Sequence, residues 1–128
     1  MNIVKTFIAK SKIEGFGLFA NEFIPKGTKI WELQTPFDVI IPKEDFEFIT
    51  DKASSMAISQ KEYLKKYSYF KDNKYVFCGD DAKFANHSLN ANTISNFDTQ
   101  FAKVDINKGD EIFCDYREIC DDFDEHNL

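Results

Sequence analysis

Residues that favour β-strands occur in short runs along this chain, and turn-forming residues separate the runs. β-branched and aromatic side chains fit a pleated surface, whereas proline cannot donate to the ladder of a central strand. Pro36 and Pro42 therefore limit the runs beside them to short or edge strands. The pattern predicts a mostly β domain of short strands, at residues 3–9, 18–20, 28–33, 37–41, 74–78, 100–104 and 111–116.

Two segments share the same turn chemistry. Ile24–Trp31 and Ile106–Phe113 agree at their first Ile, Lys, Gly and second Ile positions. A glycine in such a turn permits a positive φ before the next strand begins. Two copies are too few for a repeat architecture, so we expect two turn-and-strand units within one domain.

The middle of the chain has a different pattern, which indicates helix. Residues 42–52 are compatible with one or two helical turns. Ser59–Glu62 has the sequence of a capping box and predicts a short helix over residues 60–67. Residues 79–92 are polar and rich in turn formers, and we expect the chain after Arg117 to be loose.

The size and composition of the chain favour one globular domain. Its 128 residues are 43% hydrophobic and 30% charged, with no apolar run of the roughly 18 residues that a membrane span requires. The first residues lack the apolar core of a signal peptide, so we expect a soluble, cytoplasmic protein. Cys78, Cys114 and Cys120 are odd in number and form no C-x-x-C pair, which predicts reduced thiols and no metal site.

The charge of the chain bears on its partners. A net charge of -6, with Arg117 as the single arginine among 16 basic residues, disfavours nucleic acid and favours a cationic partner such as a lysine-rich protein segment. Residues 121–125 concentrate the acidic charge, although a solvated tail that confers solubility is an equally physical interpretation of such a run.

Taken one at a time, the candidate functional residues carry little information. Gly15-Phe16-Gly17 lacks the third glycine and the following helix of a dinucleotide-binding turn, so it indicates either a plain turn or close backbone approach to a ligand. His87 with Cys78 or Cys114 could form a base and nucleophile pair, but nothing in the sequence lowers the pKa of either thiol.

The order of these motifs is more informative than each motif alone. The chain resembles the SET-domain protein lysine methyltransferases, and it is most similar to their small stand-alone bacterial and viral members, over residues 4–117. The matching motifs are Gly15–Ala20, Ile24–Ile30, Phe84–Ser88 and Ile106–Ile112 followed by Asp115-Tyr116.

The resemblance implies a β-clip fold whose C-terminal segment threads under a preceding loop as a pseudoknot, with a helical insert at about residues 42–75. It implies an S-adenosylmethionine-dependent enzyme that methylates a lysine side chain of a protein substrate. Gly15, Phe16 and Gly17 would contact the methionine part of the cofactor, Asn86 its amino group and His87 its adenine. Tyr116 would be the catalytic residue, beside the reacting methyl group.

Several positions depart from the family pattern. Leu33 stands where many members have a channel tyrosine, and Cys114 stands where a larger aromatic residue is common, which favours multiple methylation. Leu89 replaces a zinc-binding cysteine and no cysteine triplet follows Tyr116, so we expect no zinc.

Without a zinc cluster, one wall of the substrate channel has to come from residues 117–123 or from the partner subunit of a homodimer. Tyr67 and Tyr69, in the insert, are either core residues or replacements for the missing channel hydroxyl. The segment 46–75 is the candidate for reading the substrate. The SET domain is expected at residues 1–117, followed by an acidic tail at 118–128.

Two other functions remain open at this stage. A degenerate SET domain would bind S-adenosylmethionine or a lysine-containing segment without turnover, which the residues Leu33, Ala91 and Cys114 favour. A structural or oligomerising β module would bind no cofactor and would tolerate replacement of Asn86.

Overall fold

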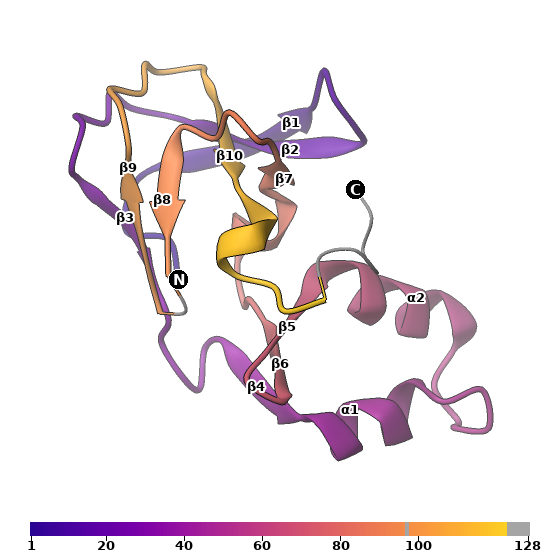
Figure 1. The fold of residues 1–128 in the computed structure, drawn as a ribbon. Coiled ribbons are helices and arrows are strands. Elements are labelled where there is room, and N and C mark those ends of the chain that lie inside the picture. Colours follow the sequence, from indigo (N-terminus) through magenta and orange to yellow (C-terminus); the bar gives the residue numbers. More distant parts are fainter. Residues whose placement is uncertain (97, 123–128) are drawn as a thin grey trace.

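The computed structural model describes residues 1–96 and 98–122, and it consists of short strands with two α-helices at one end (Figure 1). The strands are β1 (Thr6–Lys10), β2 (Phe16–Ala20), β3 (Lys29–Glu32), β4 (Val39–Pro42), β5 (Ser68–Lys71), β6 (Lys74–Phe77), β7 (Asn86–His87), β8 (Thr93–Ser95), β9 (Thr99–Ala102) and β10 (Glu111–Cys114). The helices are α1 (Lys43–Thr50), α2 (Ile58–Tyr67) and two short 3₁₀ turns, η1 (Asp81–Phe84) and η2 (Tyr116–Glu118).

The strands form three small sheets, in the orders β1-β2-β10-β7, β3-β9-β8 and β4-β6-β5. β10 pairs with β2 in the antiparallel direction and with β7 in the parallel direction. The penultimate element of the chain thus lies between its N-terminal hairpin and β7, which joins three segments that are distant in sequence (Figure 1).

The first strand begins later than the sequence predicts, because residues 2–3 pair with a different sheet. Asn2 forms a bridge to Trp31, and the Ile3 amide donates to the Ile30 carbonyl at 2.8 Å. The chain then crosses to β1, which pairs with β2 from Thr6 onwards. The apolar run at 3–9 therefore contributes backbone hydrogen bonds to two different sheets.

The two turn-and-strand units pair with each other in the core. The amide of Ile24 donates to the Ile106 carbonyl at 2.8 Å, and the amide of Ile106 donates back at 2.9 Å. Both side chains are buried, and Gly27 and Gly109 have φ of 88° and 93°. The similarity between the two segments thus reflects a symmetric contact at the centre of the molecule. The rest of the main core is Leu18, Ala20, Ile30, Trp31, Cys78, Ala85, Ala102, Ile112 and Cys114.

The helical insert matches the expected region but not its expected helix start. α2 begins at Ile58, its N-cap residue Ala57 makes no side-chain hydrogen bond, and Ser59 lies inside the helix. The capping-box prediction was therefore wrong. The insert is fixed by packing instead: the rings of Phe46 on α1 and Tyr75 on β6 stack at 3.7 Å between centroids.

The chain after Arg117 is ordered up to the end of the described region, which corrects the expectation of a loose tail. Cys120 is buried, and the Asp121 amide donates to the Phe70 carbonyl at 2.7 Å. The Asp121 carboxylate also accepts from the Asp72 amide at 3.0 Å and pairs with Lys71 Nζ at 3.2 Å. Asp124 and Glu125 of the acidic run at 121–125 lie outside the described residues.

Within residues 1–96 and 98–122, no helix combines the length and the apolar character that crossing a membrane would require.

Candidate active site

A cavity with a mostly apolar lining lies where the insert, the 3₁₀ turns and the strands β2, β3, β9 and β10 meet. Its walls include Leu18 from β2, Trp31 from β3, Tyr69 from β5, Gln100 from β9 and Tyr116 from η2. Elements from both ends of the chain are needed to close it, because β10 and η2 follow the insert in sequence but lie beside β2 in space.

Tyr116 is held at three atoms. Its hydroxyl donates to the Ala85 carbonyl at 2.7 Å, and its amide donates to Nδ1 of His87 at 3.0 Å. Its carbonyl accepts from the Cys120 amide at 2.8 Å. Burial raises the pKa of the Tyr116 phenol above its ordinary value. The side chain is therefore a fixed, neutral phenol at physiological pH rather than a base.

Two further tyrosines line the same cavity. Tyr69 is partly buried and packs against the core, and Tyr67 stacks edge-on with Phe84, with ring centroids 5.2 Å apart. Burial also raises the pKa of Tyr69, so its hydroxyl stays protonated. Leu33 packs against the core but is absent from the cavity lining, so the phenol hydroxyls that the insert brings to this site are those of Tyr67 and Tyr69.

All three cysteines line the cavity as protonated thiols. Burial raises the pKa of Cys78 to about 12, that of Cys114 to about 11 and that of Cys120 to about 12. Gln100 Nε2 donates to the Cys114 sulfur at 2.8 Å. Because a thiol must ionise to act as a nucleophile, the cysteine and histidine pair that the sequence left open is disfavoured.

The cavity lining also includes two residues with buried, unpartnered polar groups and two lysines. The indole nitrogen of Trp31 and the hydroxyl of Ser68 are buried without a hydrogen-bond partner among the described residues, and both residues line the cavity. The charged side chains in the described lining are Lys66 and Lys83, so no carboxylate there neutralises a cation that enters.

The C-terminal segment supplies one wall of the cavity. Ile119 and Cys120 line the cavity, and Asp121 fastens the segment to the β5–β6 turn. No group of three described His, Cys, Asp or Glu side chains is arranged to hold a metal ion.

A second cluster lies around the turn between β1 and β2. Asn86 Nδ2 donates to the carbonyl oxygens of Glu14 and Phe16 at 3.1 and 3.2 Å, and to Glu111 Oε2 at 3.2 Å. Gly15 has a φ of 50°, and the Phe16 side chain is exposed. The structure thus places the segment around Gly15 and Phe16 beside Asn86, and the binding of a cofactor by these residues and Gly17 stays a prediction.

The cavity and the cluster around the β1–β2 turn are separate sites that Tyr116 connects. Gly15, Phe16, Gly17, Asn86 and His87 lie outside the described lining of the cavity. The connection runs through Tyr116, whose ring lines the cavity while its amide is bound by His87. Cys114, two residues earlier, lines the cavity as well and pairs in register with His87.

The family assignment agrees with this arrangement. The SET domain family model matches residues 15–117, which include the insert, Asn86, Tyr116 and most of the cavity lining. The chain belongs to the SET domain family. The mostly β SET fold expected from the sequence is confirmed.

Solved structures of SET proteins share this fold. A Plasmodium falciparum protein described as a histone methyltransferase matches with a TM-score of 0.58 and 24% identity, over 88% of this chain and 93% of that one. The Neurospora histone lysine methyltransferase DIM-5 matches with a TM-score of 0.62 and 20% identity, over 90% of this chain and 53% of that one.

The Polycomb Repressive Complex 2 of Chaetomium thermophilum, in a structure bound to S-adenosylmethionine, matches with a TM-score of 0.68 and 20% identity. This chain covers 16% of that one, so the likeness concerns the SET fold alone. No curated protein sequence matches this chain.

Two features of the site could not be found by motif reading. The Ala85 carbonyl, which holds the Tyr116 hydroxyl, is a backbone atom and leaves no mark in the sequence. Glu111 belongs to a recognised motif, but only the fold shows that its carboxylate reaches the turn at Ser11.

Proposed function

We propose that this SET domain transfers a methyl group from S-adenosylmethionine to the side-chain amine of a lysine in a protein substrate. The observation that carries the proposal is the position of Tyr116, whose ring lines the cavity while its hydroxyl and amide are bound by Ala85 and His87, on either side of Asn86. One residue thereby connects a cavity for an aliphatic chain with the cluster proposed for the cofactor.

The residues of the second cluster fit the amino acid part of S-adenosylmethionine. Asn86 Nδ2 donates its hydrogen bonds to Glu14, Phe16 and Glu111, and no described residue donates a hydrogen bond to Asn86 Oδ1. A free carbonyl oxygen is an acceptor suited to an ammonium group.

Gly15, Phe16, Gly17, Asn86 and His87 are the residues proposed to hold the cofactor. When bound, S-adenosylmethionine supplies an electrophilic methyl group on a positively charged sulfur.

The cavity favours the nucleophilic form of the substrate. A lysine amine has a pKa of about 10.4 in water and must lose its proton before it can attack a methyl carbon. Burial disfavours the charged form, and no described lining residue is a carboxylate that would retain the ammonium ion. The proton is released to solvent before the side chain is fully enclosed.

Tyr116 acts by orientation rather than by proton transfer. Because its hydroxyl already donates to Ala85, its oxygen lone pairs remain available to accept a hydrogen bond from the amine. Tyr69 is positioned in the same lining to supply a second hydroxyl. Holding the nitrogen in line with a methyl carbon accounts for much of such a reaction, on the order of 7 kcal/mol.

Other features bear on the substrate. The small side chain of Cys114 leaves space in the cavity wall, which favours the addition of more than one methyl group. The net charge of -6 favours association with a basic protein segment, and the insert between residues 46 and 75 is proposed to read the residues around the target lysine.

Calorimetric titration with S-adenosylmethionine tests the cofactor assignment. We expect the unmodified protein to bind it, and the Asn86→Ala variant to bind it about tenfold more weakly, because the ammonium acceptor is lost. No binding by the unmodified protein would contradict the proposal. Binding without transfer of a methyl group to any protein of a lysate would instead support a degenerate domain.

A further inference from the structure

The Glu111 carboxylate is the centre of a hydrogen-bond network that joins segments distant in sequence. Oε1 and Oε2 accept from the Ser11 hydroxyl at 3.0 and 2.9 Å, and Oε2 accepts from Asn86 Nδ2 at 3.2 Å. Glu111 is half-buried on β10, and Ser11 is buried just after β1. One carboxylate therefore joins β10 to the β1–β2 turn and to β7.

Ser11 transmits this contact into the turn. Its hydroxyl oxygen accepts from the Ile13 amide at 3.0 Å, and its own amide donates to the Gly15 carbonyl at 2.8 Å. These bonds shape the segment that offers the Glu14 and Phe16 carbonyls to Asn86. The turn and the Asn86 side chain are consequently held in one arrangement by a shared acceptor.

Gly17 is needed for the same network. A Cβ at this position would lie 2.4 Å from Glu111 Oε2 and 3.2 Å from the Ser11 Cβ. The absence of a side chain therefore makes room for the carboxylate.

We infer that Glu111 is a positioning residue for cofactor binding, which holds the Asn86 amide with its nitrogen inward and its Oδ1 outward. This inference rests on the proposed function. A carboxylate can only accept hydrogen bonds, so it favours the amide orientation in which Nδ2 faces it. The opposite orientation would place two oxygens against each other and turn a donor towards the cofactor's ammonium group.

The test compares two ligands that differ in the group Asn86 is proposed to bind. S-adenosylmethionine carries the amino acid part, whereas 5′-methylthioadenosine lacks it. By calorimetry, we expect Glu111→Ala to lower affinity for S-adenosylmethionine about tenfold and to leave affinity for 5′-methylthioadenosine within about twofold. Glu111→Gln keeps an acceptor for Asn86 and is expected to restore most of the affinity.

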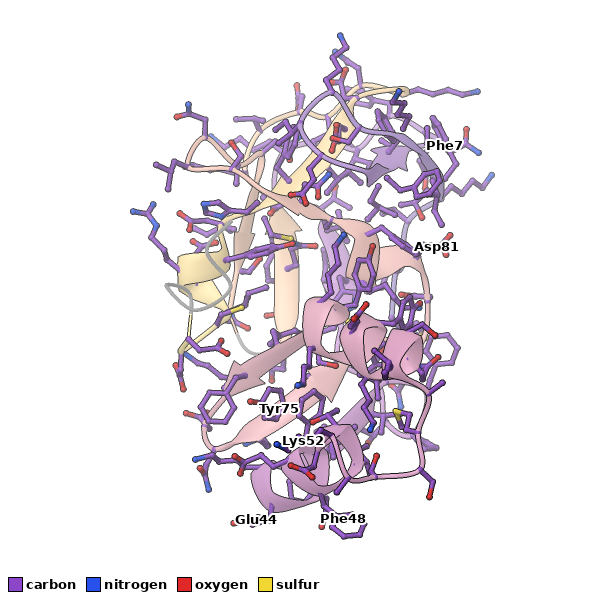
Figure 2. The ribbon with its side chains drawn as sticks, turned by 90° about the vertical axis from the view of Figure 1, so that its right-hand side faces the viewer. Phe7, Glu44, Phe48, Lys52, Tyr75 and Asp81 are labelled. Atoms are coloured by element: carbon purple, nitrogen blue, oxygen red, sulfur yellow. The ribbon has the colours of Figure 1, made fainter. Side chains whose placement is uncertain are left out.

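A double-mutant cycle separates this role from a general structural one. Once Asn86→Ala has removed the amide, adding Glu111→Ala should cause no further loss of S-adenosylmethionine affinity. Ser11→Ala, which removes a single hydroxyl, provides a milder variant and should weaken S-adenosylmethionine alone, by about threefold. Glu44→Ala on α1 removes the same charge at the far end of the molecule, where Figure 2 shows Glu44, and should change neither affinity.

The outcomes distinguish this inference from the proposed function. Equal losses for both ligands in Glu111→Ala, additive effects with Asn86→Ala, or unchanged affinities would overturn the positioning role. If the unmodified protein binds neither ligand, the cofactor assignment itself fails.

Discussion

At the scale of single residues, the most constrained charge in the described chain is the Asp38 carboxylate. The residue is fully buried and accepts from the Met1 amino group at 2.8 Å and from the Gln34 and Gly79 amides at 2.9 Å each. A buried carboxylate is tolerated only where several donors satisfy it. These contacts tie the start of β4 to the segment after β6.

Asp38→Asn is expected to destabilise the fold by about 3 kcal/mol, because an amide NH₂ would face donors that a carboxylate oxygen now accepts from. Urea unfolding of the variant, compared with the exposed replacement Glu44→Gln, measures the difference. A loss of stability no larger than that of Glu44→Gln would show that Asp38 is not a structural anchor.

Some contacts of single residues could be predicted from the sequence, and others could not. The resemblance named the residues of the proposed cofactor cluster because each lies in a motif with a distinctive order, and in the structure Asn86 contacts the turn around Phe16. The contacts of Glu111 and Asp38 were not predicted, since each depends on atoms that are many residues away in sequence. Their roles as binding or catalytic residues stay predictions until ligand binding is measured.

At the scale of elements, the segment after η2 closes the cavity through a few contacts at its end. Asp121 is exposed, and its backbone and carboxylate contact the β5–β6 turn at Phe70, Lys71 and Asp72. The Asp72 amide and the Lys71 ammonium hold the pKa of Asp121 below its usual range. A lowered pKa means that the contact is complete near neutral pH and is lost as the pH falls below about 4.

Asp121→Asn should loosen this wall at neutral pH, because the ion pair is lost and the bond from Asp72 weakens. Hydrogen exchange should become several-fold faster at the Cys120 and Asp121 amides, and remain unchanged in β1. Asp72→Asn removes a neighbouring charge whose carboxylate makes no described contact, and serves as the control. Unchanged exchange in Asp121→Asn would show that the wall is held by the buried Cys120 instead.

The elements differ in how well the sequence predicts them. β2, β3, β6, β9 and β10 follow clear apolar patterns and were expected near their observed positions. β8 and β7 were missed because two or three residues carry no periodicity, and β5 was missed because it directly follows α2. The start of α2 was predicted wrongly, since the helix begins at Ile58, before the capping-box sequence, and its N-cap residue makes no side-chain hydrogen bond.

At the scale of the whole molecule, the cavity depends on β10 lying between β2 and β7. Local patterns predicted a mostly β domain, but they contain no information on this order of strands. The resemblance of the ordered motifs to a known family predicted this strand order, because the family's fold defines which distant segments lie side by side. The structure explains why all of these motifs border a single connected region.

The three buried thiols give the molecule an expected alkaline instability. The pKa of Cys114 is raised from an ordinary 9.0 to about 11 in the folded state, so the unfolded chain ionises first as the pH rises. The stability is therefore complete below pH 9 and declines above it, by about 1.4 kcal/mol per pH unit for each such group. Cys114→Ala should show a shallower decline of unfolding free energy between about pH 9 and 10.5. Parallel slopes for the two proteins would contradict this.

The most direct test of the account is transfer of a labelled methyl group from S-adenosylmethionine to lysine-rich proteins, by the unmodified protein and by Tyr116→Phe. We expect the unmodified protein to label lysine side chains. Tyr116→Phe should label them about a hundredfold more slowly while binding the cofactor with nearly the same affinity, because only the orienting hydroxyl is lost. Equal rates for the two proteins would contradict the role of Tyr116 and the methyl-transfer geometry built on it.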